Sequence, residues 1–135
     1  MQGLVFAWAR PAGFAHPTLL LASAAWLFAA AAAAGPADVL QARADCNAAT
    51  CSFSATVRHA DTGWDHYANR FEVVGPDGKV IATRVLQHPH VQEQPVTRTL
   101  EGVRVPEGVE LVRIRAGDSR HGLGGAEVEV RIERK

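Results

Sequence analysis

The sequence predicts an all-β domain of seven antiparallel strands that follows an N-terminal signal helix. From Asp38 onward apolar residues recur with a period of two, and no stretch keeps the period of three to four that a helix needs. Charge divides the chain in the same place. Of 14 Lys and Arg and 14 Asp and Glu residues, only Arg10 lies in residues 1–34.

Residues 1–34 are typical of an export signal. Arg10 precedes the uncharged, apolar run Leu19–Ala34, whose 16 residues fall short of the roughly 20 that span a bilayer as a helix. The run ends in three alanines, so we expect cleavage after Ala34, with Ala37 as a second choice and an uncleaved anchor as the alternative. No Cys directly follows the run, so lipid attachment is not expected there. The expected product is a periplasmic or secreted domain, residues 35–135, with no membrane span.

Alternation and turn residues define each strand in order. In the second predicted strand Phe53, Ala55 and Val57 share one face, opposite polar side chains. Turn sequences at 76–78 and 106–108 and the glycine-rich stretch 122–125 separate later strands. The strands are expected near 38–46, 51–59, 67–74, 79–87, 95–104, 109–117 and 126–134.

Seven short strands in about 100 residues resemble the Greek-key sandwiches of immunoglobulin-like and fibronectin-type-III-like domains. The resemblance rests on spacing, because the Cys…Trp…Cys pattern of antibody domains is absent. It implies two antiparallel sheets, with the second and sixth strands facing each other from opposite sheets.

Four residues separate Cys46 from Cys51, and alternating segments flank the pair. In an oxidising compartment this pair predicts a disulfide across a hairpin. A half-site for a soft metal, or two free thiols, are the alternatives.

Charge and size exclude several functions. Residues from Gly35 onward carry 13 basic and 14 acidic side chains, which gives no cationic field for nucleic acid. About 100 residues also leave no room for a nucleotide-binding domain beside a substrate domain.

Every histidine after residue 34 lies in a link that antiparallel strands bring to one end of the domain. The links after the second, fourth and sixth strands carry them, together with three aspartates, of which two belong to the predicted site. The predicted metal-site residues are His59, His66, His88, His90, His121, Asp61 and Asp118.

His59 and Asp118 continue the inward faces of the second and sixth strands, so the two side chains are expected to approach across the mouth of the core. Such a pair can be a metal ligand with its hydrogen-bonding partner, a proton shuttle or a structural hydrogen bond.

The link 58–67 can supply two imidazoles and a carboxylate to Zn²⁺ or Cu²⁺, although its spacing matches no zinc ribbon or HExxH helix. Alternatively, Asp61 caps a tight turn before Gly63, and Trp64 covers the edge of the core. Pro89 restricts the backbone conformation of His88, so the side chains of His88 and His90 are expected to point to the same side. They either bind an ion there or are solvated residues of a surface loop.

The types of donor atom in the domain limit which metal ions it can bind. The domain has no Met and its two Cys are expected to be oxidised, which leaves Zn²⁺ or Cu²⁺, with Ni²⁺ as a further alternative. The predicted function is binding of a divalent transition metal by an exported protein, more readily than catalysis.

Two other functions remain open. A metal-free module could recognise a protein, peptide or glycan in the envelope through Trp64, Tyr67, Asp65 and Glu93. A hydrolase could use a metal-bound water, with Glu93 or Asp65 as the base.

Three segments, Arg58–Val73, His88–Leu100 and Arg115–Gly122, together resemble a family of small exported bacterial proteins known only as uncharacterised sequences. The resemblance is densest in the links that carry histidine. It implies a shared site without stating what the site does.

Overall fold

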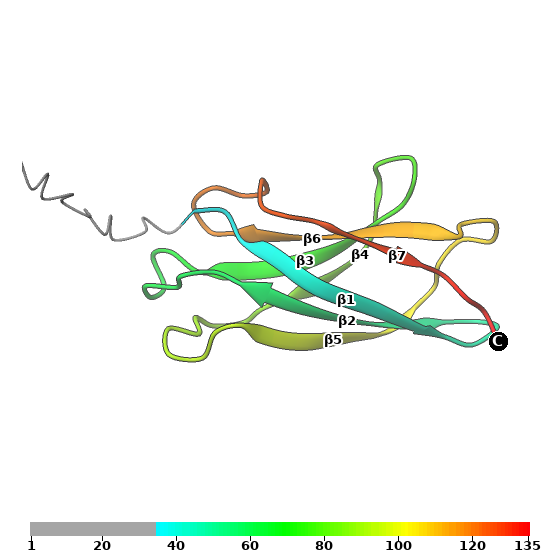
Figure 1. Ribbon diagram of the computed structural model, residues 1–135, viewed down its shortest axis with the longest axis horizontal. Helices are drawn as coiled ribbons and strands as arrows, with labels where there is room; N and C mark the ends of the chain where they lie inside the picture. The colour runs from blue at the N-terminus through cyan, green and yellow to red at the C-terminus, as the bar shows by residue number, and fades with distance from the viewer. Residues whose placement is uncertain (1–34) are drawn as a thin grey trace, which may run out of the picture.

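The computed structural model describes residues 35–135 as seven β-strands in two antiparallel sheets, without a helix in that range (Figure 1). The predicted all-β class is therefore confirmed, while the predicted signal helix lies outside the described residues. Each strand lies inside its predicted range or within one residue of it. The strands are β1 (Asp38–Cys46), β2 (Cys51–Arg58), β3 (Ala68–Val74), β4 (Val80–Val85), β5 (Val96–Val103), β6 (Leu111–Asp118) and β7 (Val128–Arg131).

One sheet has the strand order β1-β2-β5 and the other β4-β3-β6-β7. The centre of the first sheet is β2, which pairs with β1 on one side and β5 on the other. In the second sheet β3 pairs with both β4 and β6. As expected from the sequence, β2 and β6 therefore belong to different sheets.

A single hydrophobic core contains side chains of both sheets. Phe53 of β2, Phe71 of β3 and Ile114 of β6 are fully buried in it. Burying each such side chain contributes roughly 1.5–3 kcal/mol of hydrophobic free energy. The alternation read from the sequence produces this core, because every second residue of a strand points to the same face.

The links β2–β3, β4–β5 and β6–β7 lie at one end of the molecule, where the described chain also begins (Figure 1). The β1–β2 hairpin, the Pro76–Gly78 turn and the C-terminus lie toward the other end. Cys46 and Cys51 form the predicted disulfide at that second end. None of the described residues forms a helix with the length and hydropathy needed to cross a membrane.

Candidate metal centre

His59 follows directly after β2 and is 3% exposed. Its Nδ1 lies 2.6 Å from Asp61 Oδ1. Its Nε2 lies 3.2 Å from Asp118 Oδ2, so the predicted approach of His59 and Asp118 is confirmed. That Nε2 is nevertheless a buried atom without a hydrogen-bond partner, because its geometry toward Asp118 is not that of a hydrogen bond.

Asp118 ends β6 and turns its buried carboxylate toward three imidazoles. Its Oδ2 lies 3.5 Å from His66 Nε2 and 3.0 Å from His121 Nδ1. Burial alone would raise the pKa of Asp118, but hydrogen bonds from the backbone of His121 and Arg120, and from the His121 ring, lower it to about 2. Asp118 is therefore ionised at neutral pH and available as a ligand.

His66 and His121 complete the group from two different links. The amide of Thr62 donates to the carbonyl of His66 across a tight turn, and this turn holds the His66 ring in the interior. His121 lies in the short loop between Asp118 and Gly122, where Gly122 adopts a φ of 67° that favours glycine. His66 Nε2 and His121 Nδ1 are 3.2 Å apart, and the His121 side chain is 44% exposed.

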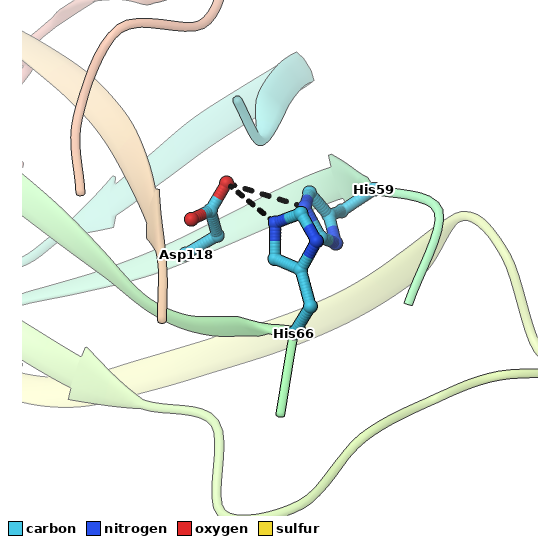
Figure 2. A group of neighbouring side chains, drawn as sticks. All are labelled: His59, His66 and Asp118. Atoms are coloured by element: carbon cyan, nitrogen blue, oxygen red, sulfur yellow. Dashed lines mark ion pairs between the residues drawn. The ribbon is translucent and has the colours of Figure 1, made fainter. Parts of the chain in front are cut away.

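Figure 2 shows the inner part of this arrangement, in which the rings of His59 and His66 both direct a nitrogen toward the carboxylate of Asp118. These three residues offer ligand atoms that all lie within 4.8 Å of one another. With His121 included, four of the separations between ligand atoms run from 3.0 to 3.5 Å. Two ligands of a tetrahedral zinc ion with bonds of about 2.0–2.1 Å are about 3.3 Å apart. These four separations match that value, while the ligand atoms of His59, His66 and Asp118 as a group lie within the wider limit of 4.8 Å.

Asp61 lies behind His59 and joins three parts of the chain. Its Oδ1 also accepts the amide of Ala68 at 2.9 Å, and its Oδ2 accepts the amide of His90 at 2.8 Å. These bonds reach the start of β3 and the β4–β5 link. Asp61 thus binds distant amides instead of capping the turn before Gly63, which was the alternative drawn from the sequence.

The structure places His88 and His90 in a different environment. Their rings lie 4.5 Å apart, centroid to centroid, with His90 buried and His88 exposed. Arg98 Nη2 lies 3.1 Å from His90 Nε2, and since a guanidinium only donates, this nitrogen is the acceptor. Burial, then the nearby charges of His88 and Arg98, lower the pKa of His90. A role for this pair in metal binding stays a prediction.

The remaining predicted residues lie on the rim of the same end. Trp64 is 68% exposed and does not cover the core edge; its ring meets that of Tyr67 edge-on at 5.6 Å. Asp65 is exposed and accepts from Arg120, with 3.5 Å between Asp65 Oδ2 and Arg120 Nη2. Glu93 is exposed in the β4–β5 link.

The sequence reasoning missed three residues that support the group. Gln94 accepts the amide of His59 at 3.1 Å and donates to the carbonyl of His90 at 3.0 Å. Ser119 accepts the amide of Tyr67 at 3.0 Å, and Arg98 contacts His90 as described above. Their partners lie between four and 52 positions away in the chain and follow no common spacing, so no sequence pattern marks them.

Comparison with known proteins adds one relative. The chain is 40% identical over 81 residues to a protein of Halomicrobium mukohataei described as "Putative lipoprotein". The matched part is 60% of this chain and spans 39% of the length of that relative. No family model matches the chain, and no solved structure matches it. The relative's name and the Cys46–Cys51 disulfide together point to a protein outside the cytoplasm.

Proposed function

We propose that this chain is a periplasmic or secreted protein that binds a divalent transition metal, Zn²⁺ or Cu²⁺, through His59, His66, His121 and Asp118. The observation that carries the proposal is the buried Nε2 of His59, which has no hydrogen-bond partner. Leaving a buried polar atom unpaired costs about 1–3 kcal/mol. A cation bonded to this nitrogen and to its three neighbours would remove that cost.

The donor set supports the choice of metals. Three imidazoles and one carboxylate are borderline and hard donors, which suit Zn²⁺ and Cu²⁺ better than Cu⁺. The two cysteines are joined in a disulfide at the other end of the molecule and offer no thiolate. His121 is the most accessible of the four side chains, so an ion would enter on its side.

Titration of the purified protein with Zn²⁺ by calorimetry, with metal content measured after dialysis, tests the proposal. We expect one ion per chain and a loss of at least about tenfold in affinity for His59→Ala and for His121→Ala. The His121→Ala variant separates lost binding from lost folding, because removing a partly exposed side chain disturbs the core least. Asp45→Asn, in the exposed part of β1, is the control and keeps the affinity. Absence of binding, or equal affinity of both histidine variants and the wild type, contradicts the proposal.

A second candidate function rests on Trp64. An exposed Trp beside Tyr67 is typical of recognition surfaces, because aromatic side chains dominate binding energy at interfaces. In this alternative the rim residues Trp64, Tyr67, Asp65 and Glu93 bind a protein, peptide or glycan without metal. A pull-down from envelope extract that survives a chelator and fails with Trp64→Ala would favour it. A pull-down that fails with chelator would favour the metal instead.

The finer architecture and the domain division are also proposals. The sheet orders β1-β2-β5 and β4-β3-β6-β7, with links that pass between sheets, support an immunoglobulin-like Greek-key sandwich. Ala37 is fully buried and packs in the core, which supports a mature domain of residues 35–135 over one that starts at Asp38. Mass spectrometry of the exported protein tests this, since an N-terminus at Gly35 is the expected result.

A further inference from the structure

We propose that Asp61 is a positioning residue of the metal centre, which fixes the ring tautomer of His59 and adds a second negative charge that strengthens the binding of a divalent ion. This inference rests on the proposed metal binding. Asp61 is not one of the four proposed ligands, and it acts through its contact with His59 Nδ1.

The tautomer follows from the partners of Asp61. Both of its oxygens face donors: Oδ1 receives the amide of Ala68 at 2.9 Å, and Oδ2 receives the amide of His90 at 2.8 Å. Because each oxygen already accepts an amide proton, Asp61 acts as an acceptor on both sides, and we assign His59 Nδ1, 2.6 Å from Oδ1, as the donor of their hydrogen bond. The proton of the neutral His59 ring is then on Nδ1. Nε2 carries a free lone pair toward Asp118 and the other imidazoles.

The charge argument is independent of the tautomer. Asp61 and Asp118 are both buried, and within residues 35–135 neither forms an ion pair with Lys or Arg. Their neighbours are imidazoles, which are neutral when they act as ligands. The two buried carboxylates are therefore stabilised by hydrogen bonds but have no cationic side chain of the described residues beside them, and a buried charge without a counter-charge is costly. One dication balances the pair, whereas a monovalent ion leaves one negative charge.

The first test is a measurement on the metal-free wild-type protein and requires no variant. Nitrogen-15 NMR at about pH 8, above the ordinary pKa of imidazole, distinguishes the two ring tautomers. We expect His59 to carry its proton on Nδ1. A proton on Nε2 overturns the proposal. The expected tautomer in a protein that binds no zinc overturns the metal function and still supports the positioning of His59 by Asp61.

The second test separates charge from general structural support. Asp61→Asn keeps the size of the side chain and removes one negative charge. We expect the affinity for Zn²⁺ to fall about 10- to 100-fold, and the affinity for Ag⁺, a monovalent probe of imidazole sites, to fall less. Asp45→Asn removes the same charge from an exposed position of β1 and is expected to change neither affinity. Unchanged zinc affinity in Asp61→Asn, or an equal loss for both ions, overturns the proposed charge role while the metal function stands.

Discussion

Gly125 shows how closely the residues next to the candidate site are packed. A Cβ atom at this position would collide with the backbone carbonyl group of Ala37, which cannot rotate away as a side chain could. Around it, the amide of Val39 donates to the carbonyl of Ala126 at 2.9 Å, and Asp38 Oδ1 accepts the amide of Ala126 at 2.7 Å. Only glycine permits this approach of the β6–β7 link to the start of β1.

We therefore expect Gly125→Ala to lower the free energy of unfolding by about 1–3 kcal/mol, as overpacking does in other interiors. Urea denaturation measures the change. Gly35→Ala is the matched control, because nothing lies within 4 Å of a Cβ added there. Equal stability of the two variants would show that the contact with Ala37 is not tight in solution.

His90 gives a pH dependence of stability. Its pKa is lowered from 6.5 in the folded protein, first by burial and then by His88 and Arg98, while Asp61 and Glu93 act in the opposite direction. At a pH between the pKa of folded His90 and 6.5, the unfolded chain binds a proton at His90 more readily than the folded protein does. Stability is thus complete above about pH 6.5 and decreases as the pH falls toward the folded pKa.

His90→Gln is expected to lose this part of the pH dependence, since Gln does not titrate and can still accept from Arg98. Denaturation curves collected from pH 8 down to about pH 5 would show the effect as a smaller slope in the variant than in the wild type. Parallel slopes would mean that His90 has an ordinary pKa in the folded state.

At the scale of elements, the β1–β2 hairpin is separate from the links that carry the candidate site. Cys46 and Cys51 pair opposite each other at its tip and are both buried. The loop that they close contains four residues, so the disulfide restricts only a small part of the unfolded chain.

Replacing both cysteines by Ala is expected to lower the free energy of unfolding by about 2 kcal/mol and to leave zinc affinity unchanged. The stability change follows from the lost constraint, and the unchanged affinity follows from the placement of the hairpin at the other end (Figure 1). Denaturation and calorimetry on the same preparation measure both. A large loss of zinc affinity would mean that the two ends are coupled through the core.

Two links act together at the candidate site. The amide of Ser119 donates to the carbonyl of Tyr67 at 2.9 Å, and the hydroxyl of Ser119 accepts the amide of Tyr67 at 3.0 Å. Arg120 Nε donates to the carbonyl of Asp65 at 3.1 Å. These bonds hold the β2–β3 link, which carries His66, against the β6–β7 link, which carries His121. A metal ion would add further bonds between the same two links.

For the whole molecule, metal binding should appear as stability. An ion that binds only the folded chain adds about 2.7 kcal/mol when its free concentration is 100 times the dissociation constant. In a domain of this size each kcal/mol raises Tm by roughly 4–8 °C. We expect Zn²⁺ to raise the Tm of the wild type and to leave that of His59→Ala nearly unchanged. Calorimetric scans with and without chelator measure the shift in Tm. Equal shifts in the wild type and in His59→Ala would mean that the ion binds at a site without His59.

The sequence by itself determined the strands and the end of the molecule at which the histidines gather. Phe53, Ala55 and Val57 point inward because a strand repeats every two residues, and this alternation is a local property that sequence displays. The approach of His59 to Asp118 followed from the same phase, continued one residue past β2 and through the last residue of β6.

Only the tertiary structure decided which of the predicted side chains lie close together: His59, His66 and Asp118, with His121 beside them. The sequence offered seven metal-site residues without ranking them. The fold placed Arg98 against His90 and turned Asp61 toward the amides of Ala68 and His90. These contacts join residues up to 29 positions apart and depend on sheet register and on the path of the links. No periodicity encodes them, because the direction of a loop side chain is set by its partners in space and not by its neighbours in the chain.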